Sequence, residues 1–312
     1  MACYCKLGRD VTDTMDNMNQ KIRVSGRALR IGRLDAELYH FLSNPGPVIE
    51  WLRSSGDRVD IFTFLQGLPG TEPKFHYPME WDNLAVVRVS TFDNWWTRQI
   101  GGKTRNMVKQ AGKKGVEIRE IGFDEKLARG IWEIYNECPM RQGRRFPHFG
   151  KDFETVYRDE ATYLQSSTFI GAFLGEELIG FIKLVADEAG QQAGLMNILS
   201  KIGHRDKAPT NALIAQAVKS CAGRGIGHLV YANFSYGNKQ HDSLREFKER
   251  NGFERVDVPR YFVPLTPVGW IALRLGLHHR FVDRIPAPLA QRLREIRKFA
   301  RNRKEQSLRE AL

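Results

Sequence analysis

Two different periods of apolar residues follow each other along the central part of the chain. After Thr168, three apolar runs of strand length are separated by short polar breaks, and they predict consecutive β-strands. Further along, Ile214, Ala217, Val218 and Cys221 recur at spacings of three and four residues, which is the pattern of a helix with one buried face. The central part is therefore predicted to combine strands and helices.

The same patterns give an ordered series of elements over residues 116–264. One strand and two helices come first, then three strands, and then two pairs of a helix and a strand, while residues 140–150 form an Arg-rich loop between the first two helices. The expected strands are 116–121, 168–174, 177–185, 193–200, 228–234 and 253–264, and the expected helices are 124–137, 152–164, 210–222 and 242–251.

The pattern is weaker before residue 116. Residues 1–25 have no apolar periodicity and are expected to be a disordered leader, and residues 26–92 are expected to be a small α+β subdomain. Ser90 or Thr91 is a suitable N-cap for a helix that runs through Val108 towards Gly115. The remaining expectations in this part are helices at 34–43 and 48–54, strands at 59–65 and 84–89, and a loop rich in Gly and Pro at 67–78.

The end of the chain has a separate, basic character. Residues 267–312 contain 11 Lys and Arg against 4 Asp and Glu, and Leu289, Leu293, Ile296 and Ala300 form one helical stripe surrounded by these cations. This tail is predicted to be a basic amphipathic helix that lies on an anionic membrane, contacts RNA or packs on the protein's own core. The expected main domain is then 93–266.

Composition restricts the class of protein. An apolar content of 42% fits a packed core, no apolar run approaches the roughly 20 residues that span a bilayer, and the polar first 20 residues lack the pattern of a secretory signal. A cytoplasmic protein is expected, held at the inner face of the membrane if its tail binds lipid. The net charge of +12 predicts an anionic partner, and the four cysteines are expected to be free thiols.

Three segments, in this order of elements, resemble the GNAT N-acyltransferases, and among them the Fem-like branch. The first is the basic stretch Lys103-Thr-Arg-Asn-Met-Val-Lys with the strand after Gly115, the second is the hairpin from Phe169 to Phe181, and the third is Phe247-Lys-Glu-Arg-Asn-Gly-Phe253. The resemblance implies an α+β fold with a mixed, mostly antiparallel central sheet. Fem proteins carry two such domains, so residues 26–92 imply a reduced first domain.

The resemblance also implies an N-acyltransferase in which an acceptor amine directly attacks an activated acyl or aminoacyl donor. The donor is an acyl-CoA such as acetyl-CoA, or an aminoacyl-tRNA. Lys248 would stabilise negative charge at the acyl carbonyl, and Tyr236 and His241 would protonate the leaving group or relay a proton. Lys248 is alternatively an exposed surface lysine, and His241 a surface residue at a helix N-terminus.

Two basic loops are the expected binding sites. Loop 201–211 has one glycine where acetyl-CoA enzymes have several, and its Lys201, Arg205, Lys207, Thr210 and Asn211 would contact the phosphates of the donor unless the loop is simply solvated. In loop 140–150 the expected acceptor-binding residues are Arg141, Arg144, Arg145 and His148, next to Phe146 and Phe149.

Other chemistries have little support in the sequence. There is no Gly-x-Ser-x-Gly motif and no cysteine in a nucleophile's context. His148, His204, His278 and His279 have no partners at metal-ligand spacing, so no metal site is expected. The alternative to an enzyme is an inactive GNAT-fold module that binds RNA or an anionic membrane surface.

Overall fold

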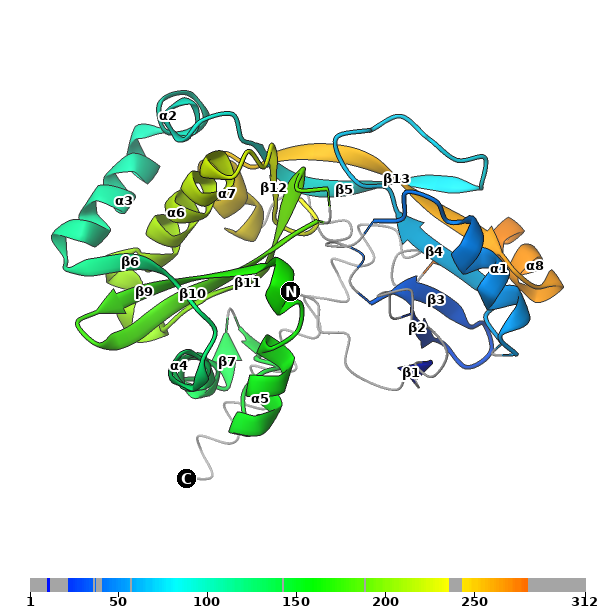
Figure 1. Cartoon of the computed structure of the whole chain (residues 1–312), viewed down its shortest axis with the longest axis horizontal. Coiled ribbons are helices and arrows are strands. Elements are labelled where there is room, and N and C mark those ends of the chain that lie inside the picture. Colours follow the sequence, from blue (N-terminus) through cyan, green and yellow to red (C-terminus); the bar gives the residue numbers. More distant parts are fainter. Residues whose placement is uncertain are drawn as a thin grey trace, which may run out of the picture.

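The computed structural model describes residues 10–11, 22–35, 37, 41–56, 58–141, 143–187, 189–235 and 243–279. Their strands form an 11-stranded sheet in the order β1-β2-β3-β4-β13-β5-β12-β11-β10-β9-β6, and a separate two-stranded hairpin, β7-β8. Figure 1 shows the long strands β5 and β13 crossing between the two halves of the molecule. The sheet is mixed and mostly antiparallel, which confirms the fold class.

The order of elements predicted over residues 116–264 is confirmed. In chain order these are β6 Val116–Ile121, α4 Glu125–Asn136, α5 Phe153–Glu160, β9 Ser167–Leu174, β10 Glu177–Ala186, β11 Gln192–Ser200, α6 Pro209–Gly223, β12 His228–Val230, α7 Ser243–Arg250 and β13 Glu254–Pro264. Within the Arg-rich loop, Met140–Arg141 and Arg144–Arg145 form the small hairpin β7-β8. Strand β12 has three residues instead of the predicted seven, for a reason given below.

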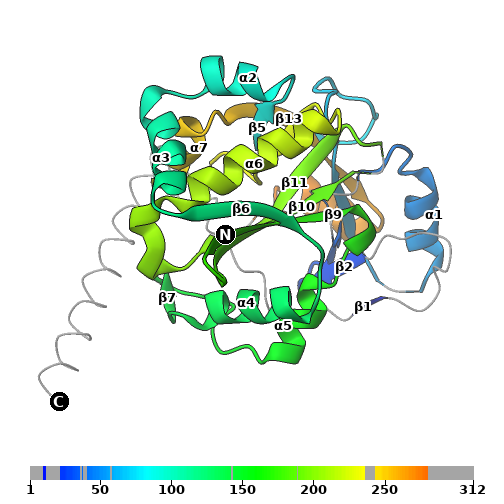
Figure 2. The same ribbon diagram turned by 60° about the vertical axis from the view of Figure 1, so that its left-hand side comes forward.

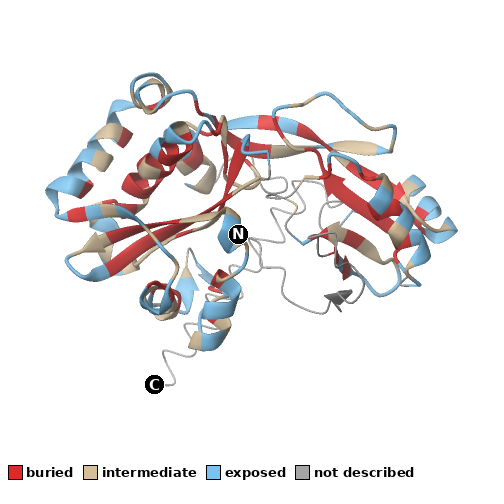
Figure 3. Cartoon of the chain, viewed as in Figure 1, coloured by how far each residue is buried: buried red, intermediate tan, exposed pale blue. Residues whose placement is uncertain are grey.

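Helices cover both faces of this part of the sheet. Figure 2 shows α3 (Gly102–Lys113), α6 and α7 on one side of the strands and α4 and α5 on the other. Each side has its own apolar core, one built on α6 and the other on Ile131, Ile134 and Val156 of α4 and α5. Buried residues follow the strands through the middle of the molecule in Figure 3.

The part before residue 90 differs most from the sequence prediction. Its elements are β1 Asp10–Val11, β2 Ile22–Ser25, β3 Ile31–Leu34, α1 Gly46–Ser54, β4 Ile61–Leu65 and β5 Met79–Arg88. The leader predicted as disordered therefore contains two strands. The helix predicted over 34–43 is wrong at both ends, because Leu34 closes β3 and residues 41–43 are not helical. Ile22 and Val24 alternate with exposed residues for one strand length only, too short a pattern to recognise.

Strand β5 belongs to both halves of the sheet. It pairs with β13 from Met79 to Val86 and with β12 from Val86 to Arg88, always antiparallel. The subdomain predicted over 26–92 thus contributes its last strand to the sheet of the following part. The boundary at residue 92 stays a prediction.

The helix predicted to start at Ser90 or Thr91 is interrupted. Thr91 is its N-cap and accepts a hydrogen bond from the Asn94 amide at 3.0 Å, after which α2 Phe92–Asn94 continues into a π-helical turn, Trp95–Gln99. Ile100 is extended and ends this turn, and α3 begins at Gly102. Trp95 is fully buried and donates from its indole nitrogen to the Asn251 carbonyl at 3.0 Å, which fixes the turn against the end of α7.

The last described helix, α8 Pro267–Arg274, packs closely on the sheet. Its N-cap Thr266 donates to Asp60 at 2.8 Å and accepts from the Gly269 amide at 3.1 Å. A Cβ atom on Gly269 would lie 1.8 Å from the Asp60 carbonyl oxygen. No helix within the described ranges is both long and apolar enough to cross a lipid bilayer.

Gly269→Ala is expected to lower the free energy of unfolding by at least about 2 kcal/mol, because backbone atoms must move to admit the methyl group. Gly112→Ala in α3 is the matched control: nothing lies within 4 Å of its Cβ position, and the change should add about 0.5–1 kcal/mol by favouring the helix. Urea denaturation measures both. Equal effects of the two substitutions would contradict the close contact at Gly269.

Candidate functional site

Strands β11 and β12 separate after three residues and leave a gap between them. They pair in parallel from Gln192 opposite His228 to Gly194 opposite Val230. Beyond this point the Tyr231 amide donates to the Ala85 carbonyl at 2.8 Å, and the Ala85 amide donates to the Ala232 carbonyl at 2.9 Å. The chain therefore follows β5 instead of β11. Residues 195–200 of β11 have no strand partner on that side in the described part of the sheet.

The chain that follows β12, residues 231–235, forms one side of this gap, called the far wall below. Side chains of β5 hold it in place. Asn233 donates to the Asp82 carboxylate at 2.8 Å, and the Ser235 amide donates to the Asn83 side chain at 2.8 Å. Ala232 adopts a left-handed conformation with φ 46°, which is rare for a residue with a Cβ. These contacts explain why the strand predicted over 228–234 ends at Val230.

The other side of the gap, called the near wall, is β11, and it contains a β-bulge. Lys183 of β10 lies opposite Asn197, and Leu184 lies opposite Leu195, so Met196 is an extra residue on β11. Bulges redirect side chains and are common beside active sites. Here the bulge falls on the stretch of β11 that β12 has left.

Lys248 lies beside the far wall and is completely buried. Its ammonium donates to the Asn233 carbonyl at 2.5 Å and lies 4.6 Å from the centre of the Tyr231 ring. It is the one buried residue of α7, since Leu244 and Phe247 are only partly covered. The alternative of an exposed surface lysine is therefore wrong. Its catalytic role stays a prediction, and Tyr236 and His241 lie outside the described residues.

The predicted phosphate loop is occupied by an acidic side chain. It forms a 3-10 helix, Ile202–Lys207, and the Ile202 and Gly203 amides both donate to the Glu137 carboxylate, at 2.7 and 3.0 Å. A carboxylate thus lies on amides of the kind that would bind a phosphate.

The five residues predicted to bind the donor differ in their surroundings. Lys201 pairs with Glu177 at 2.7 Å and Glu133 at 3.3 Å, and Lys207 pairs with Asp206. Thr210 contacts the Ser200 hydroxyl at 3.1 Å, and Asn211 is buried and donates to Asn251 at 3.1 Å. Arg205 is exposed and has no ion-pair partner among the described residues. The pairing of Lys201 could not be predicted from the sequence, because Glu133 and Glu177 lie on distant elements.

The predicted acceptor loop divides into an inner and an outer group. Arg141 is turned inward and donates to the Ser200 carbonyl at 2.8 Å and to Glu137 at 3.0 Å. The His148 ring packs at a tilt on Tyr135, with 4.4 Å between ring centres, and burial together with the nearby Lys151 ammonium lowers the pKa of His148 to about 4. Arg144 and Arg145 are exposed on the β8 strand. Only these two are open to solvent for a ligand.

A buried polar cluster lies on the α4 and α5 face of the sheet. The Glu160 carboxylate accepts from the Tyr135 hydroxyl at 2.7 Å and from the Asn197 amide at 2.8 and 3.0 Å. Lys183 is fully buried and donates to the Glu160 and Thr162 carbonyls, both at 2.7 Å.

The environment of this cluster shifts two pKa values. Burial raises the pKa of the Glu160 carboxyl, although the hydrogen bond from Tyr135 acts in the opposite direction. Burial lowers the pKa of Lys183 to about 8, against the attraction of Glu160. Such shifts are typical of functional sites and also of structural ion pairs. The sequence analysis missed the cluster. Its available signal was Lys183, the single charged residue in the apolar stretch from Leu178 to Val185.

A groove lies away from the gap. It has a volume of about 670 Å³ and is lined by β6, α4 and the turn between β9 and β10, including Arg119, Phe123, Arg129 and Leu178. None of the predicted site residues lines it. The predicted site residues and this groove therefore lie in different places.

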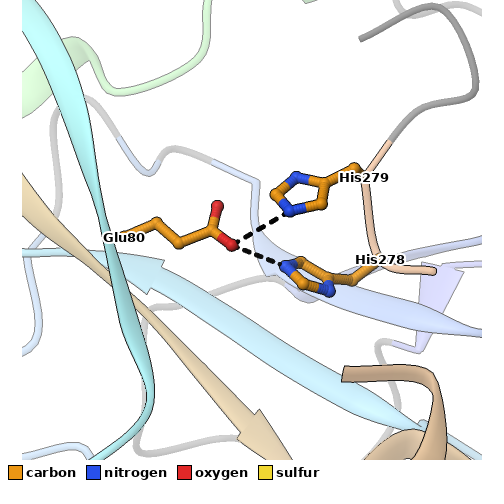
Figure 4. Close-up of side chains that lie close together, drawn as sticks. All are labelled: Glu80, His278 and His279. Atoms are coloured by element: carbon orange, nitrogen blue, oxygen red, sulfur yellow. Dashed lines mark hydrogen bonds and ion pairs between the residues drawn. The ribbon is translucent and has the colours of Figure 1, made fainter. Parts of the chain in front are cut away.

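Three residues distant in sequence meet outside the gap. His278 and His279, after α8, both approach Glu80 of β5 (Figure 4). The sequence analysis found no ligand set here because Glu80 lies 198 positions before His278.

Comparison with solved structures identifies the fold. The L-PGS of Bacillus licheniformis aligns with a TM-score of 0.54 and 14% identity, over 84% of this chain and 87% of that one. The C-terminal domain of a provisionally named lysylphosphatidylglycerol synthetase from Agrobacterium fabrum gives 0.52 and 14%, over 83% and 85%. FemX gives 0.52 and 11%, over 86% and 90%. No protein-family profile and no curated protein matches.

The chain therefore has the GNAT acyltransferase fold, as its sequence motifs indicated. Within that fold, its arrangement is shared with FemX, with L-PGS and with the domain from Agrobacterium fabrum over most of each chain's length. At this level of identity, the similarity establishes the architecture.

The low pKa of His148 makes stability depend on pH. Between pH 6.5 and about 4 the unfolded chain binds a proton at this residue that the folded chain does not bind, so stability falls as the pH is lowered through this range. His148→Phe keeps a ring against Tyr135 and should reduce the loss of unfolding free energy between pH 7 and pH 5 by about 2 kcal/mol. Urea denaturation at the two pH values measures this, with exposed His76→Gln as control. The same pH dependence in parent and His148→Phe would contradict the assignment.

Proposed function

We propose that the chain is an N-acyltransferase that transfers an aminoacyl group from an aminoacyl-tRNA to an amine. The observation that carries the proposal is the gap between β11 and β12, bordered by the bulge at Met196 and by the buried ammonium of Lys248. A gap of this kind would connect the two faces of the sheet. A donor held on the α6 side can then present its carbonyl to an acceptor on the α4 and α5 side.

The occupied phosphate loop supports an aminoacyl-tRNA over acetyl-CoA. The pyrophosphate of a CoA donor would have to displace the Glu137 carboxylate from the Ile202 and Gly203 amides. It would also have to compete with Glu133 and Glu177 for Lys201. A tRNA-linked donor does not need this loop, and the net charge of +12 favours a polyanionic donor.

The chemistry needs few residues. The lone pair of the acceptor amine attacks the ester carbonyl, the ester C–O bond breaks, and the proton lost by the amine goes to the departing ribose oxygen. Negative charge builds up on the carbonyl oxygen during this step. Lys248 is the proposed source of positive charge for that oxygen, and Tyr236 or His241 is the proposed proton carrier.

The acceptor is proposed to approach from the α4 and α5 side. Arg144 and Arg145 are exposed there and would attract an anionic group on the acceptor. The Glu160 carboxylate and its partner Asn197, which directly follows the bulge, lie on the same side. They would position the amine opposite the carbonyl.

An anionic membrane surface is the proposed partner of the C-terminal part. Helix α8 and the turn after it expose the large apolar side chains of Val268, Trp270, Ile271, Leu275 and Leu277, and a basic segment follows. Apolar residues beside cations are typical of proteins that bind anionic lipid surfaces. One of the compared structures carries the name lysylphosphatidylglycerol synthetase, after a product that joins a lysyl group to an anionic lipid, which agrees with this partner.

The test of the proposed function uses a mixture of tRNAs charged with labelled amino acids, and acetyl-CoA in parallel. We expect transfer of label to primary amines from the tRNA mixture only. Lys248→Met should reduce that transfer by about 100-fold or more, the usual effect of losing a group that stabilises developing charge. Because Lys248 is buried, the unfolding free energy of the Lys248→Met protein should also fall by about 1–3 kcal/mol. Activity is therefore compared below the melting range of both proteins.

Glu137→Ala is the informative control for the donor. It frees the Ile202 and Gly203 amides and should strengthen CoA binding measured by calorimetry. Tight CoA binding by the parent would show that the loop is compatible with this donor. Equal binding of charged and uncharged tRNA without any transfer would instead support the alternative, a GNAT-fold module that binds RNA.

The membrane partner is tested by sedimentation with vesicles. The full chain should sediment with anionic vesicles at low salt and be released as salt rises. It should not sediment with neutral vesicles. Trp270→Ser combined with Ile271→Ser keeps the buried face of α8 and should weaken sedimentation about 10-fold or more. A chain ending at His279 should lose the salt-dependent part of its binding to anionic vesicles. Unchanged sedimentation of both variants would contradict the proposed surface.

A further inference from the structure

The cluster of Glu80, His278 and His279 has the chemistry of a cation site. One carboxylate oxygen of Glu80 lies 2.8 Å from Nε2 of His278 and 3.1 Å from Nε2 of His279. The ligand atoms of all three residues lie within 4.8 Å of one another. We propose that these residues bind one divalent transition-metal ion of the zinc type, which joins the turn after α8 to β5.

The donor set and its spacing fit such an ion. Zinc binds imidazole nitrogen and carboxylate oxygen at about 2.0–2.2 Å, so neighbouring ligand atoms in a tetrahedral site are about 3.3 Å apart. The distances from the Glu80 oxygen to the two Nε2 atoms, 2.8 and 3.1 Å, would have to increase by only a few tenths of an ångström. Two histidines and one carboxylate leave the fourth position for water.

The convergence of the two rings distinguishes this cluster from an ordinary ion pair. Both imidazoles point their Nε2 atoms at the same carboxylate oxygen (Figure 4), and their ring centres are 4.0 Å apart. A simple ion pair requires one such contact. Two imidazole nitrogens and one carboxylate oxygen gathered within 4.8 Å form a donor set of the kind that a zinc-type ion binds.

The residues that carry the ligands are held firmly. Glu80 lies in β5 opposite Arg260 of β13. The His278 side chain is only 4% exposed and packs on Phe262, with 4.7 Å between ring centres. Helix α8, directly before the histidines, is fixed by the contact of Gly269 with Asp60. A site on such elements needs little reorganisation on binding.

The site is accessible and distinct from the gap. The side chains of Glu80 and His279 are 43% and 41% exposed, so an ion can enter from solvent. Glu80 is six residues before Val86 on one extended strand, and Val86 is where β5 meets β12, a distance of about 20 Å. The ion would therefore fix the position from which the C-terminal segment leaves the sheet, without contacting the transferred group.

The experiment uses the full chain after dialysis against a chelator. Titration with Zn²⁺ in a calorimeter should give one ion per chain, and Co²⁺ should give the visible absorption of a low-symmetry site with nitrogen ligands. His279→Asn and Glu80→Gln each remove one ligand at a partly exposed position and should weaken Zn²⁺ binding by at least about 10-fold. The melting temperature of the parent should rise with Zn²⁺ and that of the two variants should not.

His76→Asn, at an exposed histidine outside the cluster, is the matched control and should bind like the parent. Absence of stoichiometric binding by the parent would overturn the proposal. Parent-like binding by both ligand variants would overturn it too, because the ion would then be held elsewhere. Aminoacyl transfer is measured separately, so loss of one result leaves the other intact.

Discussion

Two backbone hydrogen bonds, from Tyr231 to Ala85 and from Ala85 to Ala232, determine where the sheet opens. A strand needs partners for its amides and carbonyls, and after Val230 the chain finds them on β5 instead of β11. The opening therefore forms where the chain after Val230 continues along β5 and no longer pairs with β11. The proposed transfer reaction depends on this pairing of residues 231–232 with β5, a strand that comes from the N-terminal half.

A network of charged and polar side chains also holds residues 231–235 against β5. The ammonium of Lys248 reaches Asn233, the Asn233 amide reaches Asp82, and Asp82 accepts from the buried guanidinium of Arg260, which also pairs with Glu37. Each charged group in this network has a hydrogen-bond partner, as burial requires. Loss of one partner would leave a charge without compensation, so the network favours a single geometry for the far wall of the gap.

The sequence predicted the fold from residue 116 onward because its strands and helices have clear apolar periods and short connections. It could not predict that β12 would end at Val230, since the cause lies in Ala85, Asp82 and Asn83 of a distant strand. For the same reason it left open an exposed surface position for Lys248, although the ammonium of this residue has a buried acceptor in Asn233. The carboxylate of Glu137 over the loop amides and the meeting of Glu80 with two histidines are likewise products of tertiary structure. Local patterns carry no information about such contacts.

The central position of β5 also affects how the chain folds during synthesis. On the ribosome, β4 and β5 emerge early, with Phe62, Phe64 and Leu84 ready to be buried, but both neighbours of β5 in the sheet, β12 and β13, are completed only after residue 228. Until then the edges of an apolar strand stay open to other chains. Pairings between residues so far apart in sequence form slowly. The first half of this protein therefore has to stay soluble while the ribosome makes the second.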